Sequence, residues 1–168
     1  HLIPCVEICP GENTSNKTIE KTKEIFTASG ASIVNVKKEI DGFILNRLQG
    51  ALLNEAMRLY SDGYASSDEI DATIRDGLGL RWAFMGPFET IDLNAPGGIK
   101  DYISRYGPMY IEMAKNQTKI PDWSEEAGKK LEIERRKILG HDELENRAKK
   151  RNQLLKSLRK VKIDNGEA

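Results

Sequence analysis

The chain has 168 residues, 39% of them hydrophobic and 31% charged, which suits one compact domain or one domain with an appendage. Lysine plus arginine and aspartate plus glutamate each number 26, so the overall charge favours neither a nucleic-acid-binding nor a membrane-surface protein. Because no apolar run is long enough to cross a bilayer and no basic-then-apolar leader is visible, we expect a water-soluble protein.

The first forty residues predict a strand, a helix and a second strand. The strand "LIPCVEIC", residues 2–9, places Glu7 on a face that is otherwise apolar. A helix capped near Thr14 and stopped by Gly30 follows, and "SIVNVKK" is the second strand. Such a βαβ unit cannot cover both faces of its strands and normally belongs to a larger parallel sheet.

The cysteines and histidines predict no metal site and no disulfide. Cys5 and Cys9 are four residues apart in an extended segment, which is too far for a disulfide. We interpret them as small buried hydrophobic residues, the alternative being a metal-binding or redox role. His1 and His141 are too few and too scattered to complete a zinc site.

The sequence from residue 41 onward predicts helices. Asp41 is the expected cap of a long helix that ends near Tyr60. Ser66 and Glu69 form a capping box, and the glycines of "GLG", residues 77–79, should end the helix that this box begins.

The remaining elements are also expected to be helical. Pro87 suits the first position of a short helix, which "PGG" closes. Further helices are expected over residues 98–116, 123–139 (after the candidate cap Asp122) and 142–161. Residues 123–163 hold 13 basic and 7 acidic side chains, a net charge of +6, so this segment is basic whereas the chain as a whole is neutral.

Three polar side chains stand among apolar neighbours and are the candidates for chemistry. Glu7 needs a partner or water, unless it lies on an edge strand and faces solvent. Asn46 either caps neighbouring backbone or points into a polar site. Arg81, beside Trp82, either binds a carboxylate with its planar fork or makes an ordinary ion pair.

The segments "VE", "GFILNRL", "EAMRLY", "DEID" and "MGPFE" resemble, in order and spacing, the 3-hydroxyacyl-CoA dehydrogenase family over residues 2–120. The resemblance implies a mainly α fold: a helical C-terminal domain, similar to that of 6-phosphogluconate dehydrogenase, preceded by the βαβ end of a Rossmann domain. The implied domains are residues 1–40 (end of the NAD-binding domain), 41–120 (helical substrate and dimerisation domain) and 121–168 (charged helical extension).

The resemblance also implies roles for the candidate residues. Glu7 matches the carboxylate that orients a general-base histidine, and Asn46 matches the asparagine that holds the substrate oxygen. Arg81, Trp82 and Asn94 are the implied substrate-binding residues. The family's histidine precedes the glutamate by about a dozen residues and is followed by Asn-Pro. His1 has neither feature, so it is not assigned this role and is interpreted as a possible tag remnant.

We therefore expect the C-terminal part of an NAD-dependent dehydrogenase that oxidises an L-gulonate-like 3-hydroxy acid or a 3-hydroxyacyl-CoA to the 3-keto product. No Gly-rich turn joins a strand to a helix, so we expect NAD in the full-length enzyme and not on these residues, which alone would be inactive. We expect a homodimer with no nucleic-acid or membrane partner, in the cytoplasm, or in mitochondria if the substrate is an acyl-CoA. The alternative is a non-catalytic helical dimerisation module with a structural role, whose basic tail binds an acidic partner.

Overall fold

The structure, a computed structural model, describes residues 2–167, so the predictions about His1 lie outside the described residues. The α-helices and strands in this range are β1 (Cys5–Ile8), α1 (Asn16–Ala28), β2 (Ser32–Asn35), α2 (Phe43–Ser61), α3 (Ser67–Ala72), α4 (Gly79–Trp82), α5 (Pro87–Leu93), α6 (Gly98–Asn116), α7 (Glu125–Ile138) and α8 (Leu144–Asp164). A π-helix, Thr73–Leu78, joins α3 to α4, and a 3₁₀ turn, His141–Glu143, precedes α8. The expected fold class, mainly α with a leading βαβ unit, is confirmed.

The chain divides into two compact units. The first consists of His1–Ala51 with Asp142–Ala168, and the second of Leu52–His141. Helix α2 begins in the first unit and ends in the second. The domain boundaries expected from the sequence, at residues 40 and 120, stay predictions.

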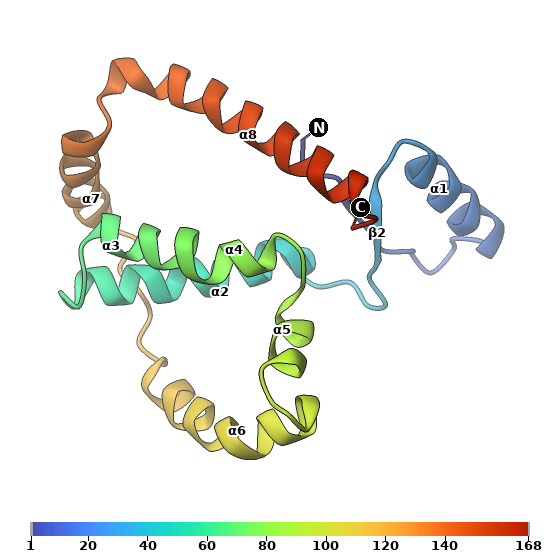
Figure 1. The fold of residues 1–168 in the computed structure, drawn as a ribbon, viewed down its shortest axis with the longest axis horizontal. Coiled ribbons are helices and arrows are strands. Elements are labelled where there is room, and N and C mark those ends of the chain that lie inside the picture. Colours follow the sequence, from blue (N-terminus) through green and yellow to red (C-terminus); the bar gives the residue numbers. More distant parts are fainter. Residues whose placement is uncertain (1, 168) are drawn as a thin grey trace. The chain divides into compact units, whose positions relative to one another are not determined.

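The first unit contains the expected parallel βαβ arrangement (Figure 1). Strands β1 and β2 pair in a register that sets Glu7 opposite Val34. The cap of α1 was predicted one residue too early, because the Ser15 hydroxyl oxygen accepts the Thr18 N–H at 3.2 Å. The hydroxyl oxygen of Thr14, the predicted cap, accepts the Gly11 N–H at 3.1 Å instead.

Gly30 ends α1 as predicted. Helix α8, which is basic, makes a hydrogen bond to the same turn. Gly30 has φ +78°, which favours glycine, and its carbonyl accepts a hydrogen bond of 2.9 Å from the Arg159 guanidinium. Helix α8 therefore belongs with the βαβ unit, although the two are far apart in the sequence.

In the second unit, α3, the π-helix and α4 form one continuous helical run (Figure 1). The predicted capping box of Ser66 and Glu69 is confirmed. The predicted helix end at the glycines of residues 77–79 is wrong, because the Gly79 N–H donates to the Ile74 carbonyl and the run continues to Trp82. A Cβ atom on Gly79 would lie 2.8 Å from that carbonyl oxygen, so the missing side chain allows the wider π turn.

The last helices match the sequence prediction closely. Pro87 begins α5, and α6 has the predicted bounds. The predicted cap of the next helix, Asp122, is wrong: Ser124 caps α7, and Asp122 accepts the Ser124 N–H at 2.9 Å.

Both units bury few side chains. The buried hydrophobic residues are Val36, Met57, Ala95 and Ala127, and no large side chain in the described range is fully buried. The accessible surface is 13036 Å². Two separate compact units of these sizes would expose on the order of 10,000 Å². The excess indicates apolar surface that each unit leaves uncovered.

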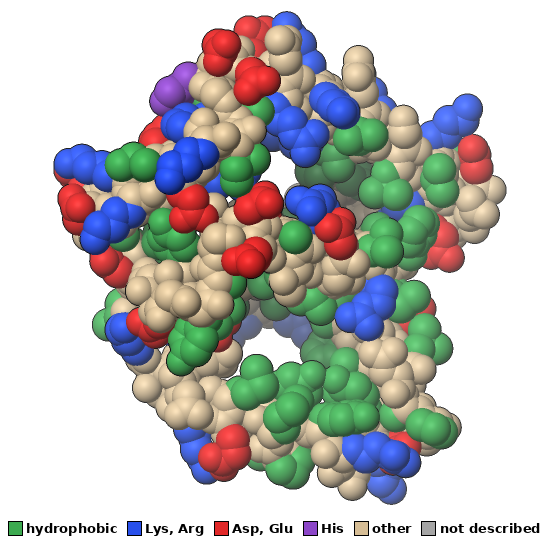
Figure 2. Space-filling view, turned by 60° about the vertical axis from the view of Figure 1, so that its left-hand side comes forward, with side chains coloured by type: hydrophobic (Ala, Val, Ile, Leu, Met, Phe, Trp, Pro, Cys, Tyr) green, Lys and Arg blue, Asp and Glu red, His purple; other side chains and the backbone are tan. Residues whose placement is uncertain are grey.

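The clearest uncovered surface is a stripe along α6, which we call the α6 stripe: Ile99, Ile103, Tyr106, Tyr110 and Met113. These residues recur every three to four positions and therefore share one face of the helix. Each side chain is more than a third exposed. Figure 2 shows hydrophobic side chains gathered in the lower part of the molecule, over α6.

Residues 2–167 contain no helix that combines the length and the hydropathy required to span a bilayer.

The π turn predicts opposite effects for alanine at two neighbouring glycines. Gly79→Ala should destabilise the protein by about 1–3 kcal/mol, because its Cβ would overlap the Ile74 carbonyl. Gly77→Ala should be neutral or stabilise by about 0.5–1 kcal/mol, because no atom lies within 4 Å of its Cβ position. Urea denaturation of both variants measures the difference. Equal stabilities would contradict the π turn.

Candidate functional site

Glu7 reaches from β1 to the start of helix α2. Its Oε1 accepts the Ile44 N–H at 2.7 Å and the Leu45 N–H at 3.2 Å, and its Oε2 lies 3.4 Å from the Leu45 nitrogen. The first backbone amides of a helix have no hydrogen-bond acceptor within the helix, and they lie at the positive end of the helix dipole. A negatively charged carboxylate therefore interacts favourably with them. The sequence left open whether Glu7 has a partner or faces solvent. In the structure it has a partner, the backbone amides of α2.

The turn before α2 has an unusual backbone. Gly42 has φ +82° and Phe43 has φ +50°, and Phe43 is the only non-glycine residue of the described range with positive φ. The predicted helix cap, Asp41, is wrong, because the carboxylate that accepts the first amides of α2 comes from Glu7. Glu7 is 37 residues from Ile44 in the sequence, so a prediction from neighbouring residues could not identify it as the cap of α2.

Asn46 follows directly in the first turn of α2. Its side chain is exposed, and within residues 2–167 its amide makes no hydrogen bond. It therefore does not cap neighbouring backbone, and both its donor and its acceptor remain available to a ligand. Glu7 thus binds the start of the helix that carries Asn46, while the catalytic roles of both residues stay predictions.

The other predicted site residues lie in the second unit. Arg81 and Trp82 end α4, and Asn94 is the C-cap of α5. All three side chains are exposed. The arginines that form ion pairs within residues 2–167 are Arg58, Arg75, Arg105, Arg135 and Arg136. Arg81 is not among them, so its guanidinium is available for a ligand.

A tyrosine pair on α6 lies within electrostatic reach of Arg81. The hydroxyl oxygens of Tyr102 and Tyr110 are 2.8 Å apart, and the Tyr102 ring centre is 4.7 Å from that of Tyr106. The hydrogen bond with Tyr110, together with desolvation, raises the pKa of Tyr102, and the positive charge of Arg81 opposes this rise. Tyr102 therefore stays a neutral phenol at neutral pH.

A second polar cluster joins α7 to the start of α3. Glu134 Oε1 accepts the Ser67 N–H at 2.7 Å and the Ser67 hydroxyl at 2.8 Å. These two hydrogen bonds, with a third from Tyr60, lower the pKa of Glu134. Burial, followed by the hydrogen bond to Glu134, raises the pKa of Tyr60. Ser67 itself is buried, so the cluster anchors α7 and does not offer a free group to a ligand.

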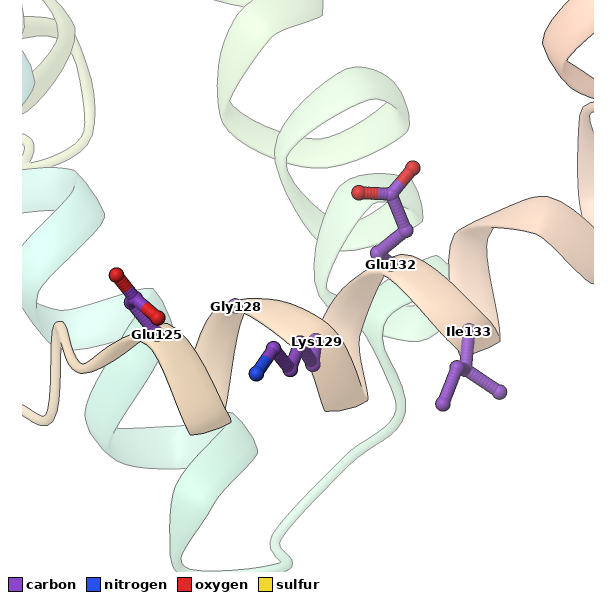
Figure 3. Close-up of a pocket in the computed structure, with 5 residues that line it drawn as sticks. All are labelled: Glu125, Gly128, Lys129, Glu132 and Ile133. Carbon is purple, nitrogen blue, oxygen red and sulfur yellow. The ribbon is translucent and has the colours of Figure 1, made fainter.

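Three cavities of the second unit are lined by residues other than the predicted ones. The first, of about 520 Å³, is an open groove whose lining side chains all come from α7 (Figure 3). Along this helix, Gly128 lies between Glu125 and Glu132. The others are an apolar cavity of about 180 Å³ beside Met57 and Trp123, and a polar one of about 470 Å³ beside Lys130 and Glu134. None of them contains Arg81, Trp82 or Asn94.

The turn between β1 and α1 differs in sequence from a dinucleotide-binding turn. The turn from β1 to α1, "CPGENTS", contains one glycine and the acidic Glu12, whereas a pyrophosphate requires a Gly-rich turn that lets the backbone approach. Within residues 2–167, no cluster of three His, Cys, Asp or Glu side chains is placed to hold a metal. Cys5 and Cys9 are free thiols and only half-buried.

Two features of the site were not predicted from the sequence. The spacing of Tyr102, Tyr106 and Tyr110, four residues apart, is a helical pattern that would have revealed the tyrosine cluster. The link between Ser67 and Glu134 spans 67 residues and had no sequence signal.

Comparison with known proteins assigns the helical part of the chain to a class of domain. The sequence profile of "3-hydroxyacyl-CoA dehydrogenase, C-terminal domain" matches residues 42–140. The chain therefore belongs to the 3-hydroxyacyl-CoA dehydrogenase family, as the resemblance predicted.

Among relatives, the chain is 44% identical over 124 residues to lambda-crystallin of Oryctolagus cuniculus, covering 74% of this chain and 39% of that one. It is 47% identical over 109 residues to L-carnitine dehydrogenase of Pseudomonas putida, covering 64% of this chain and 34% of that one. The chain thus spans between a third and two fifths of the length of these relatives.

A solved structure supports the fold. The chain is similar, with a TM-score of 0.76 and 21% identity, to the crystal structure of 5-formyl-3-hydroxy-2-methylpyridine 4-carboxylic acid 5-dehydrogenase, an NAD⁺-dependent dismutase. The match covers 100% of this chain and 54% of that one.

Because the pKa of Glu134 is lowered, we expect the folded protein to become less stable at acidic pH. Because folding lowers this pKa below its ordinary value of 4.5, ionised Glu134 stabilises the fold above pH 4.5. That stabilisation is lost as the pH falls through the lower, folded value. The Tm of the parent protein should therefore fall more steeply below pH 4.5 than the Tm of Glu134→Gln.

The control for this measurement is Glu112→Gln, which removes an exposed ion pair with Lys115. Its Tm should follow that of the parent protein at every pH. If Glu134→Gln also followed the parent, the Ser67–Glu134 contact would not stabilise the fold.

Proposed function

We propose that the chain is the substrate-side, C-terminal part of an NAD-dependent dehydrogenase that oxidises the hydroxyl group of a 3-hydroxy acid to a ketone. The observation that supports this proposal is that Glu7 accepts hydrogen bonds from the first amides of α2, the helix that bears Asn46. The chain also belongs to the 3-hydroxyacyl-CoA dehydrogenase family. This chain matches between a third and two fifths of the length of its relatives, so we assign the nucleotide site and the catalytic histidine to the rest of the enzyme.

In this proposal Asn46 and Glu7 have separate tasks. The Asn46 amide donates a hydrogen bond to the substrate oxygen and holds it for deprotonation. The Glu7 carboxylate has about four acceptor positions, of which the amides of α2 use mainly those on Oε1. Its Oε2 therefore keeps capacity for the N–H of an imidazole, whose positive charge the carboxylate stabilises. NAD, held by the rest of the enzyme, would supply the hydride acceptor for this oxidation.

The proposed substrate is a small hydroxy carboxylate such as L-gulonate, in preference to an acyl-CoA. Arg81 supports this choice, because its unpaired, exposed guanidinium matches a carboxylate in charge and in geometry. L-Carnitine, which names one relative, also carries a carboxylate and a hydroxyl on its third carbon. A hydroxy-acid substrate fits a cytoplasmic enzyme, and an acyl-CoA substrate would fit a mitochondrial one.

The direct test is turnover by the intact protein, measured as NADH formation with L-gulonate, L-carnitine and a 3-hydroxyacyl-CoA. Arg81→Ala should raise the KM for the hydroxy acid at least about tenfold, because a charged hydrogen-bond pair is lost. Arg75→Ala, which removes an exposed arginine six residues earlier that pairs with Asp76, should leave KM unchanged. Failure to oxidise any of these substrates would refute the proposal, and an unchanged KM in Arg81→Ala would remove Arg81 from the substrate site.

We propose further that the chain forms a homodimer through the α6 stripe. The stripe is apolar and exposed and runs from Ile99 to Met113, over fifteen of the nineteen residues of α6, and an apolar face of this kind favours association. The small buried core supports the proposal, because a partner would cover surface that the units leave open.

A substitution in the stripe should separate the subunits. The chain has a mass of 18.9 kDa, and sedimentation should give twice this value. Ile103→Glu places a charge in the stripe, so this variant should sediment with the mass of a monomer. Ile111 is similarly exposed but lies on another face of α6, so Ile111→Glu should leave the dimer intact. A parent protein that sediments as a monomer would contradict this proposal.

The second candidate function is a non-catalytic interaction module. Helix α8 supports it, because it carries eight basic and two acidic side chains and lies outside the matched residues 42–140. Binding of an acidic partner that weakens with salt would favour the module, and thermal stabilisation of the intact protein by a hydroxy acid would favour the enzyme.

A further inference from the structure

The start of α2 has a conformation that its own sequence does not favour. Positive φ is rare and strained for a bulky residue such as Phe43, and it persists only where neighbouring contacts determine it. The Phe43 N–H donates to the Ile40 carbonyl at 3.0 Å, which closes the turn on one side. The next two amides, of Ile44 and Leu45, have their acceptor on β1.

The contact with β1 fixes the helix start in space. Oε1 of Glu7 receives both amides, and two donors converging on one oxygen determine the direction of the helix as well as its position. Glu7 is itself held in the β1–β2 ladder opposite Val34. Asn46, the residue after Leu45, is therefore oriented relative to the sheet by the side chain of Glu7.

We infer that Glu7 is a positioning residue for Asn46: by accepting the Ile44 and Leu45 amides it locks the strained Phe43 turn and aims the Asn46 amide. The consequence for catalysis rests on the function proposed above, whereas the locking of the turn does not. One carboxylate then has two tasks: Oε1 holds the helix that bears Asn46, and, in the function proposed above, Oε2 supports the general base.

The two tasks are separable by substitution. Glu7→Gln keeps an oxygen acceptor of nearly the same reach but loses the negative charge, so it should keep the turn and lose the support of an imidazolium ion. Glu7→Ala loses both. Glu12→Ala removes an exposed glutamate of the following loop and is the matched control.

Amide hydrogen exchange on this chain tests the locking directly. In Glu7→Ala the Ile44 and Leu45 amides should exchange about five- to thirtyfold faster than in the parent chain. In Glu7→Gln and Glu12→Ala they should stay within about threefold of it. The capped Glu69 amide of α3 is the internal reference: it should not change, and it separates local release from general unfolding.

Unchanged exchange at Ile44 and Leu45 in Glu7→Ala would overturn the inference. So would equal acceleration in Glu7→Gln and Glu7→Ala with an unchanged reference, because an oxygen acceptor would then be without effect. If Glu7→Ala unfolds the chain, Glu7→Gln alone decides: retained protection supports the lock, and lost protection refutes it.

Kinetics of the intact enzyme test the link to Asn46. Glu7→Ala should raise KM on the order of tenfold and lower kcat, and Glu7→Gln should restore KM alone. In an Asn46→Ala background, Glu7→Ala should no longer change KM. Additive effects on KM would overturn the positioning role. An inactive parent enzyme would refute the proposed function, while the exchange experiment would still decide the locking of the turn.

Discussion

The hydrogen bonds from the first amides of α2 to Glu7 are the constraint on which the candidate site depends. The first backbone amides of a helix need hydrogen-bond acceptors from outside the helix. Residues 41–43 supply no acceptor to the Ile44 and Leu45 amides, and Glu7 does. The acceptor comes from a strand, so the sheet and the helix cannot be arranged independently. The Glu7 carboxylate is thereby placed at the start of the helix that bears Asn46, whose amide is available for a ligand.

The second unit relies on a related principle. Its few buried side chains are supplemented by polar contacts at helix ends: the box of Ser66 and Glu69, and the reach of Glu134 to Ser67. Such contacts fix where helices begin without covering their apolar faces. The α6 stripe remains open as a result, and a partner surface is the simplest complement to it.

The sequence predicted elements whose signals are local. The capping box of α3, Pro87 at the start of α5 and the bounds of α6 are set by residues within one turn of the feature, and all three were correct. The caps of α1 and α7 were misplaced by one and two residues, because neighbouring Thr, Ser and Asp side chains all suit a cap and only one reaches the free amide.

The errors of larger consequence have non-local or subtle causes. Asp41 was a reasonable cap, but Glu7 provides the acceptor across 37 residues. The glycines of residues 77–79 suggested a helix end, yet Gly79 permits a π turn that continues the helix. The residues of the candidate site were found by resemblance to a family. Only the hydrogen bonds between β1 and α2 show that the Glu7 carboxylate lies at the start of the helix that bears Asn46.

The most direct measurement is the nuclear scalar coupling across the hydrogen bond between the Ile44 amide nitrogen and the side-chain carboxyl carbon of Glu7. A short N–H···O contact of 2.7 Å predicts a detectable coupling to this carbon. A coupling from the Ile44 amide to the carboxyl carbon of Asp41, or to a backbone carbonyl of the preceding turn, would show that the helix is capped locally. The account of the site given above would then be contradicted.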